Sequence, residues 1–214
     1  MSDIFHEVNE EVRREQFKKL WDRYGIFVVI AAVLVVAGVA GWRGYQWWQA
    51  KQAAEASVAY DAASELLQQG KAAEAEAAFA KLATDGTTGY RVLARLRAAE
   101  AEKNPEAAVA AYDSIATDSS VPPTFQQLAS IRAAMLLVDT APLADLTARL
   151  EPLTAADSTF RHTARELLAL AAVKANDPAS AKKWIDMLLA DAETPQGVRA
   201  RADVLSTLSQ SGKS

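Results

Sequence analysis

The sequence predicts an all-α protein in which a single N-terminal transmembrane helix is followed by a solenoid of helical hairpins. Three observations lead to this fold class. One stretch near the N-terminus, Tyr24–Trp42, contains no charged residue. Beyond it the chain is rich in alanine, a strong helix former, and no segment alternates apolar and polar residues as a half-buried strand does. Helix-breaking residues then recur at nearly constant intervals.

The uncharged stretch has the length and composition of a membrane-spanning helix. Its nineteen residues would extend about 28 Å as an α-helix, close to the thickness of a bilayer's hydrocarbon core. Amphipathic aromatic side chains, which prefer the headgroup region, flank it at both ends. We assign six of them to the membrane interface: Trp21, Tyr24, Trp42, Tyr45, Trp47 and Trp48. A buried core helix of a soluble domain would leave these two aromatic belts unexplained.

The distribution of Lys and Arg predicts the orientation of this helix. Residues 1–25 contain five basic residues and residues 43–67 contain two, so the N-terminus is expected to stay in the cytoplasm. A cleavable signal peptide ending at Gly38-Val39-Ala40 is the competing interpretation, but the long region before the apolar run argues against it. We therefore expect a cytosolic amphipathic tail at 1–23, an uncleaved transmembrane anchor at 24–42 and a folded domain at 43–214. For the tail, a solvated segment is an open alternative to a helix on the membrane surface.

The composition excludes several classes of function. Of 27 acidic and 23 basic residues, residues 1–25 contain six and five, which leaves 21 and 18 beyond the anchor and no basic excess for nucleic acid. The absence of cysteine removes disulfides, zinc–thiolate sites and cysteine nucleophiles. The two histidines, His6 and His162, fall on opposite sides of the predicted membrane, and no catalytic motif is present. We expect a non-enzymatic protein without cofactor or metal.

The chain after the anchor is built from repeats. Breakers at Gly70, Asn104, Ala141 and Asp177 are separated by 34, 37 and 36 residues, the period of helix-turn-helix solenoid units, and we expect four units. A helix at 49–69 leads into them, with Gly70 as its expected C-cap. Shorter helices are expected at 72–85, 105–118, 142–157 and 178–191, and longer ones at 90–103, 124–139, 160–175 and 195–209. The period predicts a tetratricopeptide-like solenoid; an irregular all-α bundle is the alternative.

One large aromatic residue marks the shorter helix of three of these units. Phe79 and Tyr112 lie at matching positions, and Trp184 lies one place earlier. In three of the shorter helices a proline stands at the start, where its missing N–H costs no hydrogen bond. We expect the three rings to be buried between helices.

Several short motifs, in their order and spacing, resemble the YfgM-like family of ancillary Sec-translocon subunits. They are Gly41-Trp42-Arg43, the Ala59-Tyr60 pair, Gly89-Tyr90 and the Leu93-Ala94-x-Leu96 segment. The resemblance implies an inner-membrane protein whose tetratricopeptide-like domain lies in the periplasm. It further implies association with the SecYEG translocon and with a membrane-anchored periplasmic chaperone, so that exported client proteins pass between them. A membrane-anchored scaffold for another envelope or cytochrome assembly complex would use the same architecture and is the alternative function.

Arginines mark the predicted partner-binding surface. Eight of the nine arginines beyond residue 50 fall in the longer, first helices of the units, which the resemblance places on the concave face. Arginine forks suit a groove that holds acidic side chains or backbone carbonyls of a partner. The candidates are Arg91, Arg95, Arg132, Arg161 and Arg165. The alternative is that these side chains form structural ion pairs with Glu100, Glu102, Glu166 and Asp203.

Overall fold

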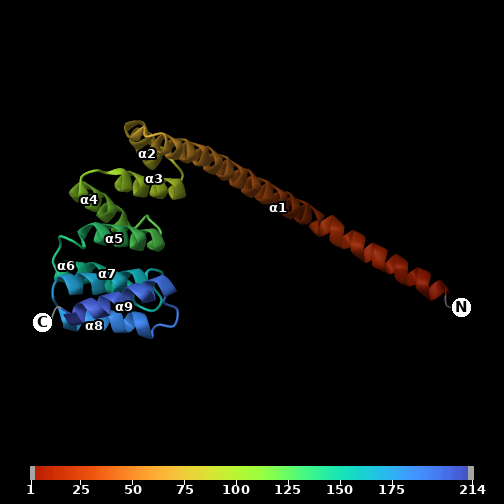
Figure 1. Ribbon diagram of the computed structural model, residues 1–214. Helices are drawn as coiled ribbons and strands as arrows, with labels where there is room; N and C mark the ends of the chain where they lie inside the picture. The colour runs from red at the N-terminus through yellow and green to blue at the C-terminus, as the bar shows by residue number, and fades with distance from the viewer. Residues whose placement is uncertain (1–2, 212–214) are drawn as a thin grey trace. The chain divides into compact units, whose positions relative to one another are not determined.

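The computed structural model describes the backbone of residues 3–211 and the side chains of residue 14 and residues 18–210. Within residues 3–211 every element is helical and no strand occurs (Figure 1). The elements are α1 (Asp3–Gln68), α2 (Ala72–Asp85), α3 (Thr88–Ala101), α4 (Pro105–Ala116), α5 (Pro123–Leu137), α6 (Leu143–Leu150), a 3-10 helix η1 (Glu151–Thr154), α7 (Arg161–Lys174), α8 (Pro178–Ala190) and α9 (Gln196–Ser211). The predicted all-α fold class is confirmed.

The chain divides into two compact units, Met1–Ala54 and Glu55–Ser214. The first unit contains the apolar part of α1, whose large side chains are exposed along its length; Ile26, Leu34 and Val36, for example, are 63%, 66% and 68% exposed. Within the described residues, α1 is the one helix long and apolar enough to cross a membrane. This agrees with a single-pass membrane anchor. The amphipathic pattern predicted for residues 1–23 falls mostly on side chains outside the described residues.

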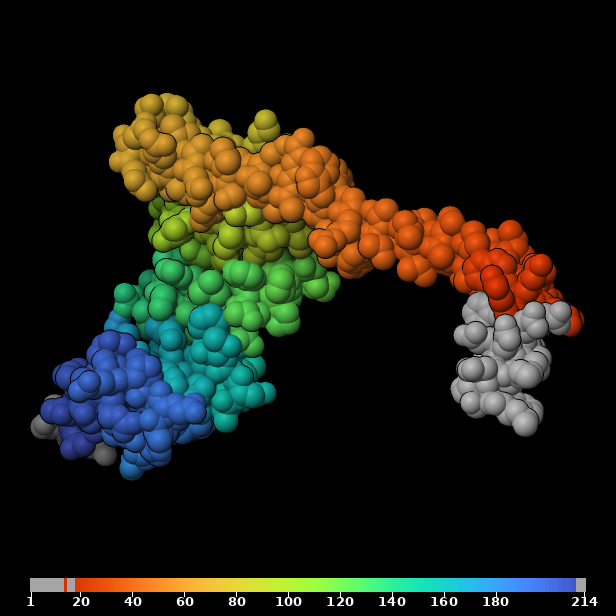
Figure 2. Space-filling view, turned by 90° about the vertical axis from the view of Figure 1, so that its right-hand side faces the viewer, coloured from red at the N-terminus to blue at the C-terminus, as the bar shows by residue number. Residues whose placement is uncertain are grey.

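The second unit is a succession of helical hairpins, each packed on the next. The end of α1 pairs with α2, α3 with α4, α5 with α6, and α7 with α8, while α9 packs on α7 and α8 at the end of the series. Figures 1 and 2 show the same order from two directions, with α2 to α9 following one another from gold to blue. Nearest-neighbour packing of this kind is what stabilises a solenoid.

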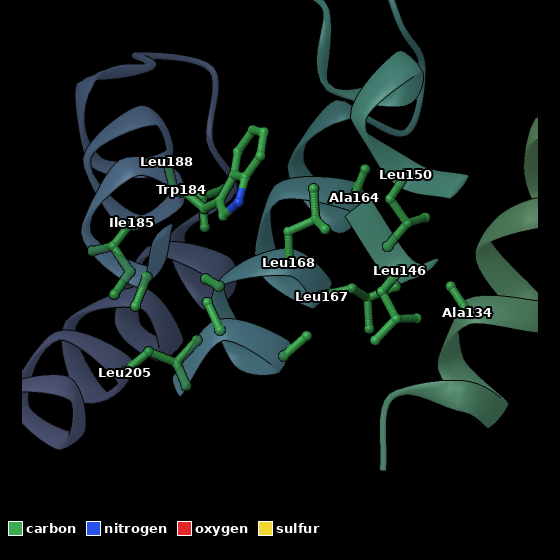
Figure 3. Packing of buried hydrophobic residues seen from close by; sticks show 14 of the residues in the cluster. Ala134, Leu146, Leu150, Ala164, Leu167, Leu168, Trp184, Ile185, Leu188 and Leu205 are labelled. Carbon is green, nitrogen blue, oxygen red and sulfur yellow. The ribbon is translucent and has the colours of Figure 1, made fainter. Parts of the chain in front are cut away.

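Three clusters of buried side chains form the core of this second unit, and each joins neighbouring hairpins. The first contains Phe79 and small residues of α1, α2 and α3, and the second surrounds Tyr112 between α3, α4 and α5. The third and largest runs from α5 to α9, where Trp184 and Leu188 of α8 face Leu168 of α7 (Figure 3). Phe79, Tyr112 and Trp184 are 0%, 4% and 2% exposed, which confirms that these three rings are buried.

Local caps explain where the helices end. Gly70 has a φ of +77°, and the N–H groups of Gly70 and Lys71 donate to the carbonyls of Leu67 and Leu66 at 3.0 and 2.9 Å. This pattern is a Schellman motif, in which a residue in the left-handed region ends the helix. Asn176, at a φ of 53°, ends α7 in the same way.

Helix starts are capped by side chains at two of the predicted breakers. The Asn104 side chain accepts the Glu106 N–H at 3.0 Å before α4, and the Asp177 side chain accepts the Ser180 N–H at 3.0 Å before α8. Most expected helices differ from the structure by one or two residues at an end, but one is much shorter: the segment 142–157 forms α6 and then η1. Pro152 cannot donate to the preceding turn and its ring crowds that turn's carbonyl, so the α-helix ends at Leu150.

Candidate functional site

The aromatic residues predicted for the membrane interface lie exposed on α1. Their exposed fractions range from 51% for Tyr24 to 67% for Trp47. Each end also carries a cation over an aromatic ring: Arg23 lies 5.8 Å from the ring centre of Tyr24, and Lys51 lies 5.8 Å from that of Trp47. Such amphipathic pairs suit a headgroup region, where apolar ring faces and charges are both accommodated. Their placement at a membrane stays a prediction.

Two of the candidate arginines converge on one carboxylate near the C-terminal end of the solenoid. Asp191 Oδ2 accepts from Arg161 Nε at 3.0 Å and from Arg165 Nη1 at 2.9 Å, and it lies 3.1 Å from His162 Nε2. These contacts, with Arg161 making the largest contribution, hold the pKa of Asp191 well below its usual range. Arg165 is only 5% exposed and donates twice more to the Thr154 carbonyl, at 3.1 and 2.8 Å. Arg161 and Arg165 thus tie α7 to η1 and to the loop after α8.

Arg95 also makes contacts within the chain, whereas Arg91 makes one long hydrogen bond within its own helix. Arg95 Nη1 donates to Asp118 Oδ2 at 2.6 Å, and its Nη2 donates to the Ser114 carbonyl at 3.1 Å. Arg91 is exposed and lies 3.5 Å from the Thr88 hydroxyl of its own helix. Of the carboxylates expected to form ion pairs, Glu100 pairs with Arg97 at 2.7 Å and Glu166 pairs with Arg201. The partner-binding role of these arginines stays a prediction.

Arg132 lies in a groove between α3 and α5, both of which are first helices of their units. Two adjoining hollows of about 330 and 190 Å³ form this groove, which we call the α3–α5 groove. Three residues line both hollows: Glu100 of α3, Tyr112 of α4 and Arg132 of α5. The larger hollow continues past the C-terminal end of α3 and along the last turns of α5, and the smaller one follows the middle turns of both helices. Tyr112 forms the floor because α4 packs against both α3 and α5.

The polar residues of the α3–α5 groove are ordered by contacts across the repeats. Arg97 Nε donates to the Tyr60 hydroxyl of α1 at 3.0 Å, while its Nη1 holds Glu100 at 2.7 Å. Burial and the nearby Glu100 carboxylate raise the pKa of Tyr112 above its ordinary value. The groove therefore combines a fixed Arg–Glu pair, a protonated tyrosine hydroxyl and the exposed Arg132 guanidinium.

A second, larger hollow lies on the other side of α3, between α2 and α4. It measures about 470 Å³ and its walls are mainly alanine side chains from these three helices. Arg95, which borders it, is already engaged by Asp118. Alanine methyl groups present no directional chemistry, so this hollow offers shape but little specificity.

Metal binding finds no support in the residues that the structure describes. Among them, no group of three or more His, Asp or Glu side chains is placed to hold a metal ion. The guanidinium groups of Arg161 and Arg165 converge on Asp191, and their positive charges repel a metal ion.

Sequence reasoning missed most of the α3–α5 groove. Tyr112 was expected only as a core residue, and neither Tyr60 nor Arg97 was singled out for binding. The exposed side chains of Met135 and Leu136, on the last turn of α5, were also missed. A usable signal existed, because a buried position occupied by tyrosine instead of phenylalanine places a hydroxyl that needs a partner.

Comparison with known proteins yields one match. A family model described as a tetratricopeptide repeat-like domain matches residues 18–182, about three quarters of the chain. The matched region begins before the apolar stretch of α1 and ends inside α8. The comparisons with curated proteins and with solved structures each found no match.

Proposed function

The chain belongs to the tetratricopeptide repeat-like domain family, and from this premise we propose that it is a non-enzymatic, membrane-anchored adaptor that binds other proteins through its helical repeats. One observation carries the proposal. The same chain joins a helix whose apolar side chains are exposed from Ile26 to Val39 with a repeat unit that presents, between first helices, a groove lined by both charged and apolar side chains. Exposed apolar surface of this extent suits lipid, and grooved helical repeats suit polypeptides.

For its location we propose a single pass through an inner membrane, with the N-terminus in the cytoplasm and the repeat unit in the periplasm. The excess of Lys and Arg before the apolar stretch supports this orientation, because basic residues near the ends of a membrane helix stay on the cytoplasmic side. The exposed tryptophans and tyrosines at both ends of the stretch support an uncleaved anchor.

For its task we propose that the adaptor works at the SecYEG translocon, where it passes exported proteins toward a membrane-anchored periplasmic chaperone. The resemblance of its motifs to the YfgM-like family supports this assignment. Two of those motifs contribute to the repeat unit directly: Tyr60 packs edge-on against Phe79 with 5.5 Å between ring centres, and Tyr90 lies 6.0 Å from Tyr60. They therefore stabilise the first hairpins.

Site-specific photocrosslinking in intact cells tests this proposal. A photoreactive amino acid replaces Val58, which is 70% exposed on α1, and a matched control replaces Ala63 of the same helix, which is fully buried. We expect the Val58 probe to crosslink to translocon subunits and the Ala63 probe to give no intermolecular product. Crosslinks from Val58 to an envelope or cytochrome assembly complex, without translocon products, would favour the alternative scaffold.

A further inference from the structure

We propose that the α3–α5 groove binds an internal segment of a partner protein in which an Asp or Glu side chain lies next to a large apolar residue. The inference rests on the proposed function, since it names the chemistry of the partner that the repeat unit would bind. Arg132 and Tyr112 would hold the carboxylate, and Met135 and Leu136 would contact the apolar residue.

Arg132 is the cation available to such a carboxylate. It is exposed, it lines both hollows of the groove, and no carboxylate among the described residues forms an ion pair with it. The other arginine of the groove, Arg97, is held by Tyr60 and Glu100. A guanidinium on a wall of a groove, with its donors unused, favours a planar carboxylate that can accept two hydrogen bonds.

Tyr112 supplies an independent sign that a ligand belongs here. The residue is only 4% exposed, and among the described residues no hydrogen bond reaches its hydroxyl. Among the described residues, every side-chain oxygen or nitrogen that is fully buried has a hydrogen-bond partner. The Tyr112 hydroxyl has no such partner, so it is not fully enclosed and must open into the groove that the ring lines. A protonated phenol on the floor of a groove donates a hydrogen bond to an oxygen above it.

The apolar part of the partner follows from the end of α5. Met135 and Leu136 are 45% and 42% exposed and line the larger hollow. They are two of the five large apolar side chains exposed among residues 55–210. Both lie within one turn of Arg132, so one segment can reach the guanidinium and these side chains together. Methionine adapts its shape to different apolar partners, which suits an adaptor with several clients.

The groove favours an internal segment over a free chain end. Arg132 and Tyr112 lie where the two hollows meet, so a chain that places a carboxylate there can continue in both directions. The net charge of the groove also suits an acidic partner, because more basic than acidic residues line it. The basic residues are Arg97, Lys103 and Arg132, and the acidic ones are Glu100 and Glu102. This slight positive excess stands out because acidic residues outnumber basic ones, 21 to 18, beyond the anchor.

Selection from a random peptide library tests the proposal. The full chain, reconstituted in lipid nanodiscs, is offered phage-displayed peptides that are fixed by constant sequences at both ends, so that no selected peptide has a free terminus. We expect the native chain to enrich Asp or Glu next to Leu, Ile, Met or Phe. Arg132→Glu should weaken binding of these peptides by about tenfold or more and should enrich Lys and Arg in their place. Tyr112→Phe, which keeps the ring, should weaken binding several-fold.

Lys81→Glu is the charge-matched control, because Lys81 is an exposed cation of α2 that lines neither hollow and is not among the candidate partner-binding residues. It should enrich the same peptides as the native chain. No acidic enrichment by the native chain, equal enrichment by Arg132→Glu, or binding that requires a free terminal carboxylate would each overturn the proposal. This selection uses the purified chain, so its outcome is independent of the Val58 crosslinks in cells. A failed selection with crosslinks to the translocon would reject the groove proposal alone. A successful selection without those crosslinks would reject only the proposed function at the translocon.

Discussion

Arg95 and Asp118 join the first helix of one repeat to the loop that follows its second helix, with 2.6 Å between Arg95 Nη1 and Asp118 Oδ2. Two units further along, Arg165 of α7 and Asp191 after α8 form a comparable pair at 2.9 Å. In both units an arginine of the first helix closes the hairpin on an aspartate at the end of the second. The first arginine is partly exposed and the other is buried, so their loss should have different consequences.

Asp118 should contribute to the free energy of unfolding of the solenoid at neutral pH, and this contribution should be lost in acid. Hydrogen bonds from Ser120 and then Arg95 lower the pKa of Asp118 from 3.8 to about 2. Because the unfolded chain binds this proton more readily than the folded chain, the stabilising contribution is complete above about pH 4 and is lost as the pH falls through about 2. Asp118→Asn should therefore lower the urea midpoint at about pH 5, and its difference from the native chain should shrink toward about pH 2. A constant difference across this range would contradict the assignment, and Asp157→Asn, at an exposed loop position, serves as the control.

Replacing Arg165 by methionine should destabilise the C-terminal repeats. The change removes two hydrogen bonds to the Thr154 carbonyl, one to Asp191 and a longer one, at 3.4 Å, to the Met187 carbonyl. Hydrogen bonds from charged donors to buried acceptors predict a loss of about 2–3 kcal/mol in the free energy of unfolding. Arg91→Met, at an exposed position, should change it by less than about 0.5 kcal/mol. Urea unfolding followed by circular dichroism measures both; unchanged stability of Arg165→Met together with weakened partner capture would instead place Arg165 on a binding surface.

The sequence predicted those parts of the fold that depend on local signals. The period of the breakers located the hairpins, and α2 begins and ends where predicted because the Gly70 turn precedes it and Gly86 caps its C-terminal end. Pro152 was the local signal overlooked inside segment 142–157. Even so, the order of helices and the three buried aromatic rings required no tertiary information.

The candidate site could be predicted only in part because it depends on long-range contacts. Arg165 can be buried because two groups that are distant in the sequence accept its hydrogen bonds. They are a carbonyl of η1 and a carboxylate after α8. The role of Tyr112 depends on how far apart α3 and α5 lie, since their separation decides whether its hydroxyl opens to a groove or is enclosed. Of the five candidate arginines, the structure places only Arg132 in this groove.

Phe79→Ala should be among the most damaging single changes in the first repeats. The ring is fully buried between α1, α2 and α3 and meets Tyr60 edge-on. Truncation of a buried phenylalanine predicts a loss of about 3–5 kcal/mol, from lost burial and from the cavity left behind. Val58→Ala, at an exposed position of α1, should have almost no effect. A urea midpoint of Phe79→Ala equal to that of the native chain would contradict the packing seen around this ring.

Proteolysis of spheroplasts should report the orientation of the anchor. With the N-terminus in the cytoplasm, external protease should remove the chain beyond about Gln49 and leave an N-terminal tag protected, as the basic residues before the apolar stretch require. Detergent lysis before the protease is added should expose the tag and serves as the control. A mature chain that begins near Gly41 or Trp42 would instead identify the segment as a cleaved signal peptide.

Two glycines should respond to alanine with opposite signs. Gly70 has a φ of +77° in the Schellman motif that ends α1, so a Cβ there would strain the backbone although it would meet no neighbouring atom within 4 Å. Gly70→Ala should cost about 1 kcal/mol in the free energy of unfolding. Gly89 lies inside α3 with equally open surroundings and no positive φ, so Gly89→Ala should stabilise by up to about 1 kcal/mol, because alanine is the better helix former. Urea unfolding of the two variants beside the native chain measures both shifts. Stabilisation by Gly70→Ala would show that the turn into α2 does not need a left-handed residue.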